Sequence, residues 1–528
     1  MKKATAVVLI AAVVLSCLAI LSGCGGQEAA SGGGGDINFE SYPLEGDYKL
    51  TYFLSPNAAV LSKFENLGET EFAKELEKRT GIQIEYIHPA AGQGDQALSL
   101  AIASGEMADI IELDWSTYQG GPTKTISDGT IIPLNDLMGQ YTPNLNQFLA
   151  EKSDIDRMIK TDDGQYYAFP FIRDGELLLR SMGIMVRRDW LEELGLEIPT
   201  TIPEMENVLR AFKNEKGVEI PITCKSDGIE GLLNIFGATN GFYLEDGVVT
   251  YGPTTERYRE AMTTLNRWYE EGLLDGNFIA NDSAAVNANV LNDKVGMVYA
   301  SGGGDLGTWL DSTENPNFDM VGIPDMLMED GSVGYAAVAI QYPGYASVAI
   351  TTACDNPALA AIFLDYAYGE EGTMLYNYGI EGVSYEMVDG MPQYTDMIYN
   401  NPDGFTMAEA MANYFRASSS GPFPQQENYI KGFYYRDQQR ESLDNWLKNY
   451  DVVKDMVMPK VSRTEEEADE YSDVMNEVEK YVAKMRSEFI IGSTDISQFD
   501  SYLAELENLG INNVIESTKN ALERYNAR

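Results

Sequence analysis

Histidine is almost absent from this sequence, since His88 is the only one among 528 residues. Ser–His–Asp and Cys–His catalysis would both have to use it, although it lies beside Pro89 in a loop-like stretch, and a zinc site could hardly be assembled around it. Asp311 to Asp319 holds several oxygen ligands but lacks EF-hand spacing, so we predict no metal and no cofactor. A glycosidase that uses two carboxylates stays open, because no local motif singles out a pair.

Positive charge is scarce. Lys and Arg number 37 against 82 Asp and Glu, so the formal net charge is −45, or −47 once Lys2 and Lys3 leave with a signal peptide. So acidic a surface repels phosphate backbones and argues against nucleic acid as a partner. It also disfavours anionic substrates unless a local basic pocket exists. We interpret the charge as solubility near an anionic cell wall.

Cysteine is scarce as well, with four residues in the chain. Cys17 and Cys24 lie in the N-terminal segment, which leaves Cys224 and Cys354 in the rest of the chain. Two thiols do not make a disulfide framework in a secreted protein of this length. We favour two small buried hydrophobes, with a bridge between them as the alternative.

The only long apolar run is Ala4 to Leu21, which follows Lys2 and Lys3 as the apolar part of a secretory signal follows its positive part. Next comes Leu21-Ser22-Gly23-Cys24, which resembles the bacterial lipobox: an aliphatic residue, two small residues and the cysteine that takes lipid. A transmembrane helix is the alternative. The polar, glycine-rich stretch at 25–35 argues against that helix, because it carries no stop-transfer lysines.

Cys17 is a poorer lipidation site than Cys24, because bulky Leu15 stands where a lipobox needs a small residue. We therefore predict a signal peptide over residues 1–23 and a lipidated, flexible tether over 24–45. A lipid with two or three chains anchors a protein firmly without a transmembrane helix.

Strand and helix patterns alternate from residue 47 onward. The patterns predict strands at 48–54, 82–86 and 109–113 and helices at 70–79 and 95–104, which together indicate a parallel α/β layer. Further helices are expected at 201–214, where Thr201 and Glu204 have capping-box spacing, and at 256–270, 358–368 and 465–486. Roughly 500 residues beyond the signal provide ample core and suggest two or more lobes.

Several phrases of the sequence resemble, in order, those of extracellular solute-binding proteins of family 1. They are the stretches at 100–111 (LAIASGEMADII), 128–137 (DGTIIPLNDL), 163–170 (DGQYYAFP), 187–201 (RRDWLEELGLEIPTT), 268–275 (WYEEGLLD) and 294–297 (KVGM). Each phrase alone is weak, but their order is specific. Met205 and the pair Met107-Ala108 depart from the family pattern, which leaves the ligand open.

The resemblance implies a periplasmic-binding-protein-like α/β fold, with two lobes joined by a hinge, a ligand cleft between them and a helical C-terminal part. We expect the first lobe at 46–182 plus 335–395 and the second at 183–334 plus 396–528. The closest subgroup is the large lipoproteins of Clostridia and Bacilli that feed oligosaccharide importers. The expected function is therefore the substrate-binding lipoprotein of an ABC importer.

The expected protein is a monomer and not an enzyme. Lipid anchors it on the outer face of a bacterial, Gram-positive cell membrane, where it passes an oligosaccharide to the permease. Two alternatives stay open: a secreted carbohydrate-active enzyme, and a surface receptor without a transport role.

Sugars are bound by aromatic faces and planar polar groups, which directs attention to Trp and Tyr beside Asp, Asn or Arg. Asp114, Trp115 and Tyr118 follow the predicted strand at 109–113, and Asn57 follows the first strand; strand carboxyl ends are where open α/β sheets place ligands. Trp309 follows the glycines at 302–304, which let backbone approach a ligand. These five residues are the predicted ligand contacts, each with a turn or core role as its alternative.

Other aromatic residues are weaker candidates. Trp190 and Trp268 have the spacing of core residues on helices, and Trp446 could reach the cleft from a later helix. Tyr335, Tyr342 and Tyr345 flank a predicted crossing between the lobes, where packing is the expected role of each.

Overall fold

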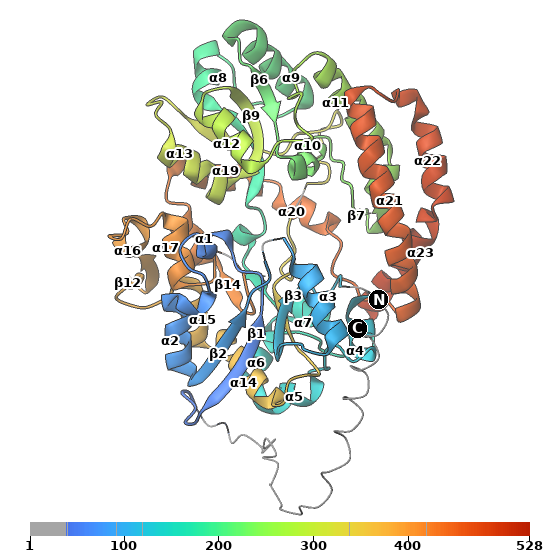
Figure 1. The fold of residues 1–528 in the computed structure, drawn as a ribbon. Helices are drawn as coiled ribbons and strands as arrows, with labels where there is room; N and C mark the ends of the chain where they lie inside the picture. The colour runs from blue at the N-terminus through green and yellow to red at the C-terminus, as the bar shows by residue number, and fades with distance from the viewer. Residues whose placement is uncertain (1–38, 40, 91, 119, 337, 419) are drawn as a thin grey trace, which may run out of the picture. The chain divides into compact units, whose positions relative to one another are not determined.

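Two four-stranded sheets organise the chain, and each is the centre of one lobe (Figure 1). The computed structural model describes residue 39 and residues 41–528, except 91, 119, 337 and 419. The predicted signal peptide and the lipidation site Cys24 lie outside the described residues. The expected α/β architecture with two lobes is confirmed.

The first sheet has the strand order β11-β3-β1-β2. Strands β1 (Tyr48–Phe53), β2 (Ile82–Ile87) and β3 (Ile110–Leu113) are parallel, and β11 (Ser347–Ile350) joins the edge of β3 in the antiparallel sense. Helices α2 (Glu71–Thr80) and α3 (Gly94–Ser104) connect the parallel strands. All five predicted elements of this region are confirmed, and no boundary is shifted by more than one residue.

Local chemistry sets the limits of α2. The Thr70 hydroxyl caps its N-terminus by accepting from the Ala73 amide, and Gly81 ends it with a φ of 73°. The left-handed conformation at Gly81 favours glycine because it has no Cβ. Between these caps, Phe72 and Leu76 lie on one face of the helix and are buried, which fixes the helix on the sheet.

The second sheet has the strand order β10-β5-β9-β6. Its strands are β5 (Met182–Arg187), β6 (Ile220–Thr223), β9 (Val295–Ser301) and β10 (Met320–Gly322). The helices of this lobe include α8 (Arg188–Leu194), α9 (Ile202–Ala211), α10 (Ile229–Asn234), α11 (Glu256–Glu270) and α12 (Ser283–Leu291). As predicted, Thr201 caps α9 by accepting from the Glu204 amide.

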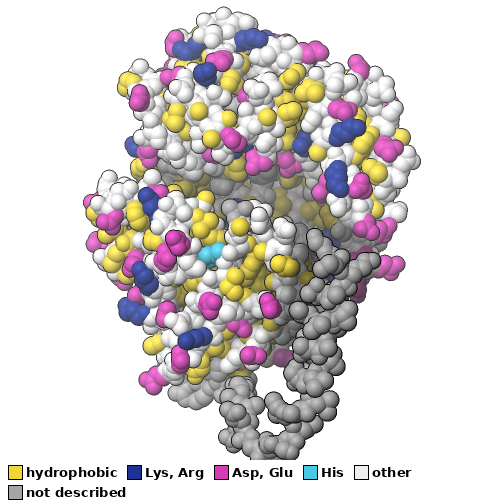
Figure 2. Space-filling model, viewed as in Figure 1, with side chains coloured by type: hydrophobic (Ala, Val, Ile, Leu, Met, Phe, Trp, Pro, Cys, Tyr) yellow, Lys and Arg dark blue, Asp and Glu magenta, His cyan; other side chains and the backbone are white. Residues whose placement is uncertain are grey.

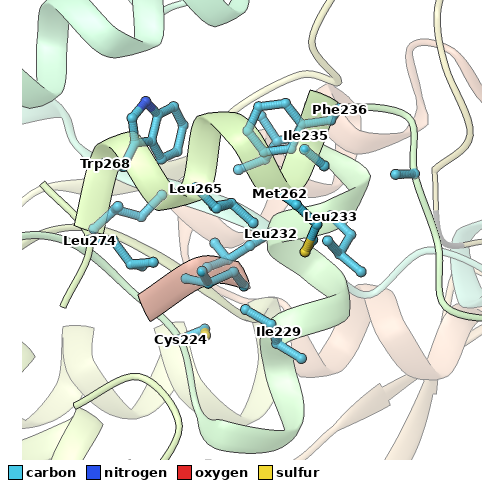
Figure 3. Packing of buried hydrophobic residues seen from close by; sticks show 14 of the residues in the cluster. Cys224, Ile229, Leu232, Leu233, Ile235, Phe236, Met262, Leu265, Trp268 and Leu274 are labelled. Atoms are coloured by element: carbon cyan, nitrogen blue, oxygen red, sulfur yellow. The ribbon is translucent and has the colours of Figure 1, made fainter. Parts of the chain in front are cut away.

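A large apolar cluster fills the second lobe. Side chains of α10 and α11, including Leu232, Met262 and Leu265, meet within it (Figure 3). Trp190 and Trp268 belong to the same cluster, which confirms their predicted structural role. Burying large apolar and aromatic side chains in this way is the main stabilising contribution to such a lobe.

Cys224 and Cys354 are free and buried, which confirms the favoured prediction over a bridge. Cys224 packs in the core of the second lobe, and Cys354 lies after β11 in the first lobe. Burial raises the pKa of each thiol to about 12. Both are therefore inert small hydrophobes rather than reactive thiolates.

The chain crosses between the lobes several times. It first passes from β4 (Ile172–Asp174) to β5 and later returns to β11. In the first lobe it then forms helices α14 (Pro357–Asp365) and α15 (Glu370–Tyr378) and the hairpin of β12 (Tyr385–Val388) and β13 (Met391–Tyr394). Helices α16 (Asp396–Tyr399), α17 (Met407–Tyr414) and α18 (Glu427–Phe433) then stay with the first lobe, and α19 (Asp437–Leu447) packs on β10 and β5 of the second.

Residues 396–433 were expected in the second lobe, and their contacts correct that boundary. Helix α17 packs on α1 (Ala58–Leu61) and α2, and Asn413 accepts from the Glu71 amide at 3.0 Å. Strand β14 (Pro424–Gln426) pairs in parallel with β4. Figure 1 shows α16 and α17 beside α1 and α15. Helical periodicity predicts a helix but does not specify the lobe on which its apolar face packs.

Three C-terminal helices form a group that touches both lobes. Helix α21 (Glu465–Ile491) packs on α11, and α22 (Phe499–Asn508) and α23 (Ile511–Ala527) follow it (Figure 1). Arg524 of α23 bonds Glu467 of α21 and also Asp162 of the first lobe, the latter at 2.6 Å. The apolar and charged contacts together hold this helical group against both sheets. Among residues 41–528 as described, none of the helices combines the length and the apolar character of a membrane span.

A buried ion pair ties the returning segment to the first sheet. Arg416 lies after α17 and bonds Glu112 of β3 at 3.0 Å, with side chains only 7% and 8% exposed. The Tyr52 hydroxyl of β1 donates to the same carboxylate at 2.6 Å. Burial alone would lower the pKa of Arg416, but the Glu112 carboxylate more than offsets this and the pKa is raised. Arg416 therefore keeps its charge in this buried position, beside the Glu112 carboxylate.

Replacing Arg416 by Met leaves the Glu112 carboxylate buried without its partner, which costs about 3–5 kcal/mol of unfolding free energy. Urea denaturation followed by circular dichroism measures this loss. Arg440→Met is the matched control, because its pair with Asp437 is 52% and 93% exposed and such pairs contribute less than about 1 kcal/mol. A loss below about 1 kcal/mol for Arg416→Met would show that the pair does not hold the segment.

Candidate functional site

A cavity of about 170 Å³ lies where the two lobes meet. We call it the aromatic cavity. From the first lobe it is lined by Phe171, Arg173, Leu178, Tyr345, Ala417, Ser418, Gln425, Tyr429, Ile430 and Phe433, and from the second lobe and the crossings by Ser181, Ser301, Gly303, Gly304 and Tyr434. Figure 2 shows a recess between the upper and lower parts of the molecule on the face viewed.

Aromatic rings supply most of the apolar lining. Tyr429 and Phe433 are four residues apart on α18, so their rings lie on one helix face and stack with centroids 5.7 Å apart. Phe171, just before β4, lies 5.7 Å from Tyr345 on the return crossing. Tyr345 is 38% exposed, so one of these rings is open to a ligand. Such faces suit the C–H surface of a sugar.

Two polar groups of the cavity lack complete hydrogen bonding. The Ser418 Oγ is buried without a partner, and so is the Nε of Arg173. Arg173 uses its other nitrogens to donate to the Leu178 carbonyl at 2.9 Å and to the Tyr345 hydroxyl at 2.7 Å. Buried polar groups are nearly always satisfied in folded proteins, so unsatisfied ones that gather at one cavity indicate a binding site.

Glycines after β9 allow the lobes to approach each other here. A Cβ on Gly303 would lie 2.2 Å from the Phe433 ring, and one on Gly302 would lie 2.8 Å from the Tyr434 hydroxyl. The sequence analysis expects this backbone to approach a ligand, whereas at Gly302 and Gly303 aromatic side chains of the protein itself lie against it. Gly304 has open space apart from Ser301 Oγ at 3.4 Å, so its backbone can face a ligand.

Three of the predicted contacts lie at the carboxyl edge of the first sheet, outside the lining of the aromatic cavity. Asn57 caps α1, its Oδ1 accepting from the Ala59 amide at 2.7 Å. Asp114 accepts from the Ser116 amide at 3.1 Å and lies 3.7 Å from Lys460 Nζ. Tyr118 is half-buried with its ring 5.6 Å from Trp115. All three have surface that a ligand can reach.

The two predicted tryptophans lie in the core and present no face to a ligand in this conformation. Trp115 is completely buried, and its indole donates to the Ile111 carbonyl at 3.0 Å. Trp309 is also completely buried, packs with Phe318 and Trp446, and donates to Asn287 at 2.8 Å. Their polar tips are satisfied inside the protein, which is the usual state of a structural tryptophan. Trp446, the weaker candidate, is buried as well.

The aromatic cavity uses residues that the sequence analysis did not select as contacts. Phe171 and Arg173 follow directly on the phrase at 163–170, so the crossing after that phrase was an available signal. Tyr345 was noted, but as a packing residue. Tyr429 and Phe433 have helical i,i+4 spacing, which is equally typical of core, and no sequence signal separates the two roles.

The chemistry of the cavity is that of binding. Its described lining carries no carboxylate, so the pair of acids that glycoside hydrolysis needs is not in place there. His88 has a structural role: its Nε2 accepts from the Leu67 amide at 3.1 Å, and its Nδ1 bonds the Leu54 carbonyl at 3.0 Å. Within the described ranges, no group of three or more His, Cys, Asp or Glu is placed to hold a metal ion.

Curated relatives match the chain over most of its length. The fructooligosaccharide ABC transporter substrate-binding protein FusA of Streptococcus pneumoniae is 25% identical and covers 98% of both chains. Lipoprotein LipO of Bacillus subtilis is 26% identical over 81% of this chain and 84% of its own.

Solved structures share the fold. The alginate-binding protein AlgQ2 without calcium ion superposes with a TM-score of 0.76, at 22% identity, over 92% of this chain and 100% of that one. FusA in complex with kestose gives a TM-score of 0.73, at 21% identity, over 91% and 99%. Both are periplasmic-binding-protein-like, as the sequence predicts. The bacterial extracellular solute-binding protein family matches residues 63–374, which is more than half of the sequence, and the chain belongs to this family.

Proposed function

We propose that the protein captures an oligosaccharide in the aromatic cavity and delivers it to the permease of an ABC importer. The observation that carries this proposal is the cavity itself, with its stacked rings, open Tyr345 face and unsatisfied Ser418 and Arg173 groups between two lobes. FusA, which is a fructooligosaccharide ABC transporter substrate-binding protein, supports it. Lipid on Cys24 would hold the protein on the outer face of a Gram-positive cell membrane as a monomer, and the lipoprotein LipO supports the anchor.

Ligand capture follows from the position of the cavity. Aromatic rings and Arg173 come from the first lobe, while Ser301 and the glycine backbone come from the second. A ligand that touches both sets stabilises the arrangement in which the lobes are closest, and a ligand that touches one set does not. The permease then distinguishes the loaded protein by its lobe arrangement. Asn57, Asp114 and Tyr118 are proposed as outer contacts for sugar units that extend beyond the cavity.

Binding without catalysis is the expected outcome of a glycan screen on the purified protein. An oligosaccharide of three to five units at 100 times its Kd should add about 2.7 kcal/mol of stability and raise the Tm by roughly 3 °C, because it binds only the folded state. Differential scanning fluorimetry measures the shift, and chromatography of the glycan checks that it is intact. Released shorter sugars would favour the carbohydrate-active enzyme, and stabilisation by peptides alone would end the sugar assignment.

Tyr345→Ala and Trp309→Ala form a matched pair of aromatic truncations. Removing the exposed Tyr345 ring should weaken glycan binding about tenfold, equal to 1.4 kcal/mol, with little change in Tm. Removing the buried Trp309 ring should lower the unfolding free energy by about 3–5 kcal/mol and leave the affinity of the folded protein nearly unchanged. Calorimetric titration and thermal melts measure the two quantities; the reverse pattern would make Trp309 the contact and Tyr345 the core residue.

Cys24→Ala should release the protein from the membrane fraction into the medium, because no lipid can be attached. Cell fractionation with immunoblotting measures the distribution, and labelling with radioactive palmitate measures lipid incorporation. Cys17→Ala is the control and should leave both unchanged. Retention of the Cys24→Ala variant in the membrane with its label intact would overturn the predicted site.

A further inference from the structure

Arg173 is the only residue with a full charge in the described lining of the aromatic cavity, and it forms no ion pair with a described carboxylate. This is unusual in a chain with 82 acidic and 37 basic residues, where most described arginines have a carboxylate partner. Arg180 on the same crossing bonds Asp325, and Arg188 bonds Asp319. The acid next to Arg173 in sequence, Asp174, is already bonded to Lys152 at 2.6 Å.

The surrounding structure holds Arg173 in place. Its backbone amide donates to Gln341 at 2.8 Å, and β4 aligns it with Gln425 of β14. The guanidinium has five N–H bonds in a rigid fork, and only two of its hydrogen bonds go to protein, at Leu178 and Tyr345. Three donors are left, one of them on the buried Nε. A planar fork with free donors is the geometry that receives a carboxylate in two parallel bonds.

A second arginine without an ion pair lines the neighbouring groove. This α21 groove, of about 390 Å³, runs between the loop at 116–122 and helix α21. Arg463 lies 3.6 Å from the Tyr471 ring centroid, donates to Thr518 at 3.3 Å and leaves its Nε buried without a partner. Glu479 lines the same groove, and burial raises its pKa.

The two spaces are neighbours. Tyr345 lines the aromatic cavity, and a Cβ on the adjacent Gly344 would lie 2.5 Å from the Oγ of Ser116, which lines the α21 groove. Lys460 lies beside them, 3.0 Å from the same Cβ position, with Asp114 as its partner at 3.7 Å. Arg173 and Arg463 therefore line two neighbouring spaces, and Lys460, paired with Asp114, lies where the spaces meet.

We infer that the ligand is an acidic oligosaccharide, with the carboxylate of a uronic acid unit on Arg173 and a second acidic unit toward Arg463. This inference rests on the proposed function and specifies its substrate class. Long-range repulsion by a net charge of −45 opposes every anion, so only short-range, charge-assisted bonds can bind one. A neutral sugar would leave the free donors of Arg173 without an anionic partner.

The test compares acidic and neutral trisaccharides of the same shape by calorimetric titration of the purified protein. The probes are trigalacturonate and trimannuronate, the full methyl ester of each, and neutral kestose. At least one triuronate should bind ten or more times tighter than its ester and than kestose. Arg173→Gln should remove this preference, Arg173→Lys should keep part of it because the charge remains, and Arg210→Gln on α9, in a solvent-exposed pair with Glu271, should have no effect.

The outcomes separate the two proposals. If kestose or an ester binds as tightly as the triuronates, the proposal of an acidic ligand is overturned, but the proposal of oligosaccharide capture still stands. A triuronate preference that survives in a folded Arg173→Gln variant would overturn the assignment to Arg173. If no trisaccharide binds but a neutral glycan of the wider screen does, the acidic class fails and oligosaccharide capture stands. A thermal melt of each variant confirms that it is folded before its affinity is compared.

Discussion

The buried contact of Arg416 with Glu112 and Tyr52 is the constraint on which the binding region depends. It fixes the chain just after α17 to the middle of the first sheet, at a point where neither charge can be lost without leaving the other buried. The described residues that follow, up to Tyr434, run across the first lobe and toward the second. That path brings β14 against β4 and turns α18 so that Tyr429 and Phe433 face the crossing.

Two kinds of contact hold the lobes in relation to each other. At the aromatic cavity the contact is close and apolar, with Phe433 against Gly303 and Tyr434 against Gly302. At the C-terminal helices it is ionic, with Arg524 between Asp162 and Glu467. Ion pairs near the surface break and form again at a small cost in free energy, whereas closely packed apolar side chains move only by larger rearrangements. The proposed ligand lies at the aromatic side, so its binding is expected to act on the contacts between the lobes there, while the ionic contacts of the C-terminal helices adjust to the new arrangement.

Sequence reasoning located the elements of this protein better than its binding side chains. The strands β1, β2 and β3 and the helices α2, α9 and α11 follow from apolar periodicity and from caps such as Thr70 and Thr201, which are local signals. Trp115 and Trp309 were placed correctly after strands, but both point into the core, and the direction of Trp309 depends on a distant partner, Asn287 of α12. The cavity joins four segments that lie far apart in the sequence, between Phe171 and Tyr434, so a local pattern can reveal single segments but not their meeting. The assignment of residues 396–433 to the second lobe was wrong for the same reason.

The net charge of the protein opposes an anionic ligand, whereas the local charge of Arg173 favours one. Which effect is stronger depends on how far the charges lie from the bound group. At about 0.15 M salt, fixed charges are screened over about 8 Å, so the many surface carboxylates act weakly on a group inside the cavity. Arg173 acts on such a group at hydrogen-bond distance, where few waters intervene. An arginine without an acidic partner is costly to keep half-buried, and replacement by a neutral side chain would relieve that cost. Its presence in an otherwise uncharged lining is explained most directly by a ligand that supplies the missing negative charge.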